Sequence, residues 1–147
     1  MLVVLLVAAS LYHIGWSQEG PLFDAGVGHM FRALASNILD ELRGKNVSVV
    51  GDLLTKISFL SGGMKQLMSL AESKSYQVFE TIKPMVREVM EKGKPKFEKI
   101  KFNDGDLVER FAWNSTQIAQ FRDLHSEIKG MLKRLEKICK LHNYKIS

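Results

Sequence analysis

A long helical stripe of apolar residues, running from Val50 to Met90, constrains the fold more than any other feature of this sequence. Its members recur mostly three or four positions apart, a spacing that places them on one side of an α-helix. Such a stripe must be covered by the rest of the chain or by a partner, because exposed apolar surface is unfavourable in water. The stripe comprises Val50, Leu53, Leu54, Ile57, Leu60, Met64, Leu67, Met68, Ala71, Val78, Ile82, Met85 and Val89.

Two interruptions divide this stripe. Ser61-Gly62-Gly63 contains adjacent glycines, which would together cost about 2 kcal/mol inside a helix. We therefore predict a hinge at Gly62 and Gly63, where two helices fold back on each other. Pro84 lacks the amide that donates to the carbonyl four residues back, so it predicts a second hinge, a kink or a restart of the helix. If the glycines were helical, the unbroken stripe would favour a surface that seeks a partner.

The far end of the stripe is predicted at Gly93 and Pro95, because neither residue favours a helix interior. The segment from Lys92 to Lys101 carries too many lysines for a buried element. We expect it to be an exposed connection, with a helical turn around Phe97 and Ile100.

A second amphipathic segment precedes the stripe. It is expected to begin near Leu22 or Asp24, of which Asp24 is a suitable N-cap. Gly44 is a suitable glycine for its C-terminal cap. Its apolar face comprises Phe23, Val27, Met30, Phe31, Leu34, Ile38 and Leu42.

Apolar residues recur at helical spacing again between Leu107 and Leu141. Asp106 matches an N-cap, with Glu109 at the third position of a capping box. One interpretation is a single helix of more than 30 residues, on the order of 50 Å long. The other is a break at Asn114, which would then cap a new helix with Gln117 at the capping-box position.

No strand pattern competes with these segments, so the sequence predicts an all-α fold, an up-and-down bundle of four to five amphipathic helices. Residues 18–147 are expected to form this bundle as a single domain, because they suffice for one core.

Residues 1–17 are predicted to be a signal peptide. The run from Met1 to Gly15 is almost wholly apolar, and it is shorter than the roughly 20 residues that span a bilayer. Gly15 and Ser17 are small residues before a cut at Gln18, and a cut after Ala9 is the alternative. The protein is therefore expected to be secreted and extracellular. Two candidate glycosylation sites, Asn46 in Asn46-Val47-Ser48 and Asn114 in Asn114-Ser115-Thr116, fit that location.

Cys139 is the only cysteine, so the domain cannot rely on internal disulfides. It lies on the apolar stripe of the last helical segment, where it is either a small buried hydrophobe or the site of an intermolecular disulfide in a homodimer.

The positive charge is concentrated in two blocks within a chain of net charge +5. Lys83 to Lys101 carries seven basic and three acidic residues, and Lys129 to Lys145 carries six basic and one acidic. These blocks either favour an anionic surface, such as lipid headgroups, or complement the dipoles of helix C-termini, and we favour the second. The sequence contains no nucleic-acid-binding motif, so nucleic acid is not an expected partner.

The residues that usually carry chemistry are scattered. His29, His125 and His142 lack the four-residue spacing of two metal ligands on one helix. Cys139 has only His142 as a local base, and its apolar surroundings favour an inert thiol. We therefore expect no enzymatic activity, no metal and no cofactor.

Two features bear on lipid binding. Pro84 and Pro95 frame an amphipathic segment, Met85-Val86-Arg87-Glu88-Val89-Met90-Glu91-Lys92-Gly93-Lys94, which resembles a proline-punctuated repeat of the exchangeable apolipoproteins. The resemblance is confined to this part of the chain and implies binding to lipid. In addition, four methionines on the stripes are candidates to line an adaptable hydrophobic cavity, and the alternative is that they belong to an ordinary core: Met64, Met68, Met85 and Met131.

The sequence thus leaves two functional hypotheses. The favoured one is a secreted, non-enzymatic helical protein that binds an extracellular protein, as a ligand, an effector or a reproductive-type secreted factor. The alternative is an extracellular, apolipoprotein-like carrier of lipid or of a small hydrophobic ligand.

Overall fold

The computed structural model describes residues 26–45 and 52–144, and within these ranges the chain is helical and contains no strand. This confirms the predicted all-α class. The elements in chain order are α3 (Gly26–Leu42), α4 (Leu53–Ala71), α5 (Tyr76–Arg87), the π-helix η1 (Glu88–Gly93), α6 (Lys94–Glu98), α7 (Asp104–Phe111) and α8 (Ser115–Leu141).

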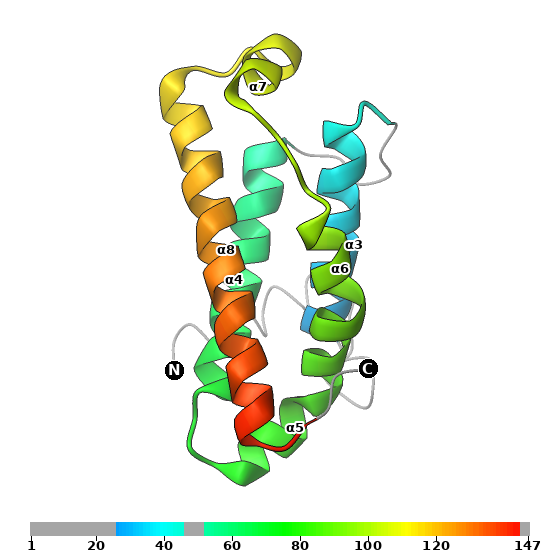
Figure 1. Ribbon diagram of the computed structural model, residues 1–147, viewed down its shortest axis with the longest axis vertical. Helices are drawn as coiled ribbons and strands as arrows, with labels where there is room; N and C mark the ends of the chain where they lie inside the picture. The colour runs from blue at the N-terminus through cyan, green and yellow to red at the C-terminus, as the bar shows by residue number, and fades with distance from the viewer. Residues whose placement is uncertain (1–25, 46–51, 145–147) are drawn as a thin grey trace.

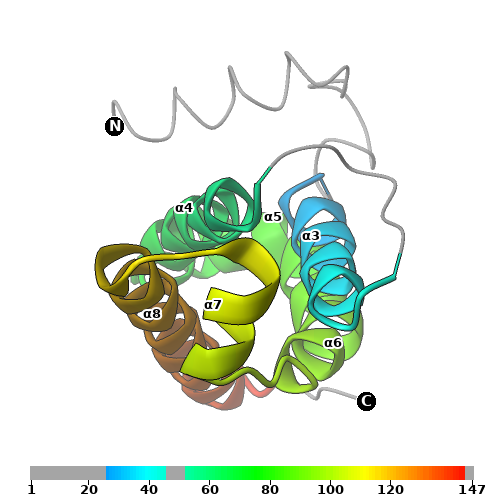
Figure 2. The same cartoon turned by 90° about the horizontal axis from the view of Figure 1, so that it is seen from above.

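The long elements form an antiparallel bundle with four arms. The arms are α3, α4, the consecutive elements α5, η1 and α6, and α8, and they alternate in direction along the chain (Figure 1). α3 packs against α4 and against the arm made of α5, η1 and α6, while α4 also packs against α8. The short α7 lies over one end of the bundle (Figure 2). The predicted up-and-down bundle is therefore confirmed.

Every α-helix contributes to one apolar core. Burial of these side chains is the main favourable term in folding, at about 25 cal/mol per Å² of apolar surface. The most deeply buried large side chains are Phe31, Ile38, Leu53, Ile57, Leu60, Met64, Leu67, Phe79, Phe97, Leu107, Phe121 and Ile128.

The prediction of a fold-back at Gly62 and Gly63 is wrong, because α4 runs without interruption through both glycines. Gly63 packs against α3, where an added Cβ would lie 2.5 Å from the terminal methyl of Met30. Burial of the flanking Leu60 and Met64, both 0% exposed, outweighs the low helix propensity of the glycines. The chain turns instead at 72–75, after which the side chain of Ser75 caps α5.

The prediction that Pro84 restarts the helix is also wrong. Pro84 lies inside α5, and the helical path continues directly into η1 and α6. In η1 the amide of Lys94 donates to the carbonyl of Val89, five residues back, as expected for a π-helical turn. Pro95 does not end the helix: it lies in the first turn of α6, directly after the π-helical turn of η1. A first turn is the helical position that best tolerates proline.

The segment from Lys92 to Lys101 is not the exposed connection that its lysines suggested. Gly93, Phe97 and Ile100 are buried, and the lysines lie on the other faces of this turn. The ring of Phe97 lies 6.2 Å from that of Phe31 on α3. Gly93 allows this contact, because an added Cβ would collide with the Phe31 ring. The segment therefore forms part of the wall of the core.

The last helical region breaks at Asn114, as one of the two interpretations proposed. Asn114 Oδ1 accepts from the Gln117 amide at 2.9 Å, and Gln117 Oε1 accepts from the Asn114 amide at 3.0 Å, which completes the capping box.

The predicted capping box of Asp106 and Glu109 is wrong, because α7 begins earlier. Its cap is Asn103, whose Oδ1 accepts from the Asp106 amide at 2.8 Å.

At the end of α3, Gly44 has φ +75°, in the left-handed region. The amide of Lys45 donates to the carbonyl of Asp40 at 2.9 Å, a bond of the Schellman type, so the predicted C-terminal glycine cap is confirmed.

Three predictions lie outside the described residues: the signal peptide at 1–17, the helix start at Leu22 or Asp24, and the sequon at Asn46.

One buried charge joins α3 to α4. The Lys56 ammonium donates to Asn37 Oδ1 and to Glu41 Oε2, both at 2.7 Å. Lys56 is only 4% exposed, so these two acceptors replace the water that its charge would otherwise attract.

Candidate functional site: a basic groove between α6 and α8

The structure brings the two basic blocks of the sequence together across one groove. From the first block, the α6 wall contains Lys94, Phe97, Glu98, Ile100 and Lys101. From the second block and the turn before it, α8 contributes His125, Lys129, Leu132, Lys133 and Glu136. We call this pocket of about 400 Å³ the α6–α8 groove. Its volume lies within the range of about 300–1,000 Å³ that is usual for sites of small ligands.

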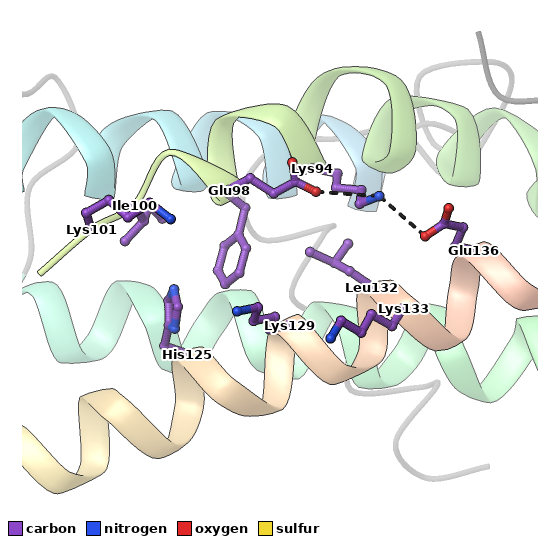
Figure 3. Close-up of a pocket in the computed structure, with 10 residues that line it drawn as sticks. Lys94, Glu98, Ile100, Lys101, His125, Lys129, Leu132, Lys133 and Glu136 are labelled. Atoms are coloured by element: carbon purple, nitrogen blue, oxygen red, sulfur yellow. Dashed lines mark hydrogen bonds and ion pairs between the residues drawn. The ribbon is translucent and has the colours of Figure 1, made fainter.

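An ion pair between Lys94 and Glu136 joins the two walls at one end of the groove. Lys94 Nζ lies 3.5 Å from Glu98 Oε1 and 3.5 Å from Glu136 Oε2 (Figure 3). Lys94 is therefore neutralised by carboxylates from both walls. The pairs are partly exposed, so their contribution to stability is modest, in the range of about 0–1 kcal/mol each.

The centre of the groove has an excess of positive charge. Figure 3 shows Lys129 and Lys133 in the space between the ribbons of α6 and α8, with Lys101 on the opposite wall. None of these three ammonium groups forms an ion pair with a carboxylate of the residues that the structure describes. Lys129 and Lys133 are four residues apart on one helix, an arrangement in which like charges repel. An anion bound between them would relieve this repulsion.

The floor of the groove is apolar and aromatic. The imidazole of His125 stacks on the ring of Phe97, with centroids 4.9 Å apart and an interplanar angle of 22°. The edge of Phe102 meets the same imidazole at 5.1 Å. Ile100 and Leu132 are both 2% exposed and close the floor. Beyond His125 the groove continues into a recess beside Arg122.

The electrostatics of His125 reflect this environment. Partial burial lowers the pKa of the imidazole below its usual range, and the nearby ammonium groups of Lys129 and Lys101 lower it further. The ring is thus held in its neutral form, which suits the aromatic stack with Phe97.

We expect the folded protein to lose stability as the pH falls through the pKa of this histidine. The pKa of His125 is lower in the folded chain than the value of about 6.5 in the unfolded chain, so the unfolded state binds more protons between the two values. The stabilising contribution of the neutral ring is present above about pH 6.5 and is lost as the pH falls through the lowered pKa of the folded state. The free energy of unfolding, measured with urea at about pH 7.5 and about pH 5, should fall more between these pH values for the wild type than for His125→Phe. Equal losses in the two proteins would contradict this assignment.

The other predicted site residues lie away from the groove. Met64, Met68 and Met131 are buried in the core, at 0%, 2% and 4% exposure, and Met85 is half-buried against it. None of the four lines the α6–α8 groove or the adjoining recess. This burial fits an ordinary core, and the hypothesis that the methionines line a ligand cavity stays a prediction.

Cys139 is fully buried and its thiol is free. Burial, with a smaller effect of the Glu136 carboxylate, raises the pKa of this thiol to about 11. A buried, protonated sulfur is a poor nucleophile and is out of reach of a second chain. This placement fits the buried hydrophobe and gives no support to a homodimer linked through Cys139.

Asn114 is exposed at the start of α8. Its Oδ1 takes the capping hydrogen bond, and Nδ2, the atom that would carry an N-linked glycan, takes no part in that bond. Glycosylation at Asn114 stays a prediction.

The described residues contain neither a candidate metal site nor a helix that could span a membrane. Among residues 26–45 and 52–144, no group of three or more His, Cys, Asp and Glu side chains is placed to hold a metal ion. No helix in the described part of the chain has both the length and the apolar character needed to span a bilayer.

Comparisons of the chain with protein-family models, with curated proteins and with solved structures gave no match. The features that bear on function are therefore the core and the α6–α8 groove.

Sequence reasoning missed this groove. The charge pattern identifies the two lysine-rich blocks but favours helix C-termini over an anionic surface, and the density of lysines predicts an exposed connection around Phe97. The available signal was that Phe97, Ile100 and Leu132 recur among the lysines of the two blocks, an interleaving of apolar and basic residues that solvent-facing caps do not require.

Proposed function

We propose that this chain is a secreted, non-enzymatic helical-bundle protein that acts by binding another extracellular protein. The observation that carries the proposal is that the apolar stripes cover one another. Ile57, Leu60 and Met64 of the central stripe are 0% exposed, so the chain needs no lipid surface to bury them. The apolar leader and the two sequons support secretion.

The surface supports the same choice. In the described part of the chain, the large hydrophobic side chains that are exposed lie on separate elements and do not form a stripe: Phe59, Tyr76, Val108 and Leu141. A lipid-associating helix would present a continuous apolar face instead.

The proposal predicts that folding is indifferent to lipid. The helical circular dichroism signal and the midpoint of thermal unfolding should be unchanged when anionic phospholipid vesicles are added, because the core is already closed. The melting curve should be cooperative without any additive. A large gain of helicity on adding vesicles would overturn the proposal and favour the apolipoprotein-like alternative.

A second candidate function is the carriage of a small hydrophobic ligand. It is favoured by one observation, the α6–α8 groove with its floor of Phe97, Ile100 and Leu132. This ligand would occupy the groove of an intact bundle and would not require the helices to open.

A further inference from the structure

We infer that the α6–α8 groove binds one organic anion that carries a carboxylate, sulfonate or phosphate group on an apolar body. The acidic group would lie among the ammonium groups of Lys101, Lys129 and Lys133, and the apolar body would lie on Phe97 and Leu132. The inference rests on the second candidate function and names its class of ligand.

The charge distribution supports an anion at the centre of the groove. Lys94, at one end, is already neutralised by Glu98 and Glu136, each at 3.5 Å. Lys101, Lys129 and Lys133 have no such carboxylate among the residues of the described ranges. A ligand anion would therefore complete the pairing that the protein leaves open, and its charge-assisted hydrogen bonds would be strong in this partly desolvated site.

The floor supports an apolar body on the same ligand. Phe97 and His125 form a stacked aromatic surface, with centroids 4.9 Å apart, and Ile100 and Leu132 extend it. Because Phe97, Ile100 and Leu132 are each 2% exposed, an apolar body would contact them only at the bottom of the groove, where inorganic phosphate would make no such contact. The groove volume of about 400 Å³ and the closure of one end by Lys94 favour a compact molecule over a peptide, which would continue past both ends.

The test uses two fluorescent probes with the same aromatic body. 1-Anilinonaphthalene-8-sulfonate carries a sulfonate, and N-phenyl-1-naphthylamine is its uncharged counterpart. We expect the sulfonate probe to bind the purified protein at one site, about tenfold or more tightly than the neutral probe, because each charged hydrogen bond is worth about a factor of ten. Binding should shift the NMR resonances of the His125 ring.

The variant is the double substitution Lys129→Gln with Lys133→Gln. Its matched control is Lys137→Gln with Lys140→Gln, which removes the same charge from exposed positions of α8 that do not line the groove. The first pair should lower the affinity for the sulfonate probe about tenfold or more, and it should change the affinity for the neutral probe by less than about twofold. The control pair should leave both probes within about twofold. All four lysines are exposed, so the variants should unfold at nearly the wild-type temperature.

Several outcomes would overturn the inference. If the wild type binds the two probes with equal affinity, the carrier function is still supported, but the ligand does not need an acidic group. An equal loss of affinity for the sulfonate probe in both double variants would show a general effect of net charge. Full competition by inorganic phosphate at the concentration of the sulfonate probe would show a bare anion site, and stronger competition by hexaglutamate would show a site for an acidic peptide. If neither probe binds, the carrier function fails as well.

Discussion

Replacing Gly28 by alanine is expected to lower the free energy of unfolding by about 2–3 kcal/mol, at the upper end of the range for overpacked cores. An added Cβ would lie 2.5 Å from the Cβ of Glu88 and 2.8 Å from the carbonyl oxygen of Met85. These atoms belong to the helical arm that crosses α3, and one of them is backbone. The two arms would have to move apart, which would also loosen the contacts of the neighbouring Phe31. Urea unfolding measures the change.

Gly62→Ala is the matched control, and we expect it to raise the free energy of unfolding by about 1 kcal/mol. Gly62 lies inside α4 on the exposed face, and no atom of the surrounding structure lies within 4 Å of an added Cβ. The same chemical change should therefore act in opposite directions at the two glycines. If Gly62→Ala destabilises the protein, α4 is not continuous through this position.

Glu41→Ala is expected to lower the free energy of unfolding by about 3 kcal/mol or more, because it leaves a buried charge without its counter-ion. The side chain of Lys56 is 3% exposed, and among the residues that the structure describes its ammonium would keep only the amide oxygen of Asn37 as an acceptor. The change should be visible both in urea unfolding and as a lower temperature of thermal unfolding.

The reverse truncation is the control for this pair. Lys56→Met removes the charge that needs a partner and keeps an apolar side chain of similar length, while Glu41, at 21% exposure, still reaches water. We expect Lys56→Met to cost less than Glu41→Ala, about 1–2 kcal/mol, because it leaves the neutral, buried oxygen of Asn37 without its donor. In the Lys56→Met background, Glu41→Ala should then cost much less than in the wild type. Equal costs in both backgrounds would show that the two residues are not coupled.

The features that could be predicted from the sequence depend on neighbouring residues. Apolar spacing identified the helices, because side chains three and four positions apart share a face wherever a helix lies. Gly44 was predicted to close α3, and a capping box at Asn114 was one of two interpretations, because each cap involves only a few consecutive residues. The structure confirms both of these local signals.

The failures occurred where a local preference competed with tertiary packing. Gly62 and Gly63 carry a penalty of about 1 kcal/mol each, but α4 buries Leu60 and Met64 on both sides of them, and the burial of one such side chain is worth about 1.5–3 kcal/mol. The sequence predicts that Pro95 ends a helix, but it lies in the first turn of α6, directly after the π-helical turn of η1. The continuous helical arm from α5 through η1 to α6 could not be predicted from the helix propensities of its residues, because a π-helical turn depends on the side chains that it packs against.

By itself, the sequence determined the helices, the bundle class and the two concentrations of positive charge, because periodicity, caps and composition are properties of short segments. Only the tertiary structure decided that Lys101 and Lys129, separated by α7 and half of α8, face each other across one groove with Phe97 and Leu132 on its floor. The physical reason is that a groove is defined by the distance between two helices. The packing of α3 and α4 on their neighbours fixes that distance, and it depends on residues far outside the two basic blocks, such as Phe31.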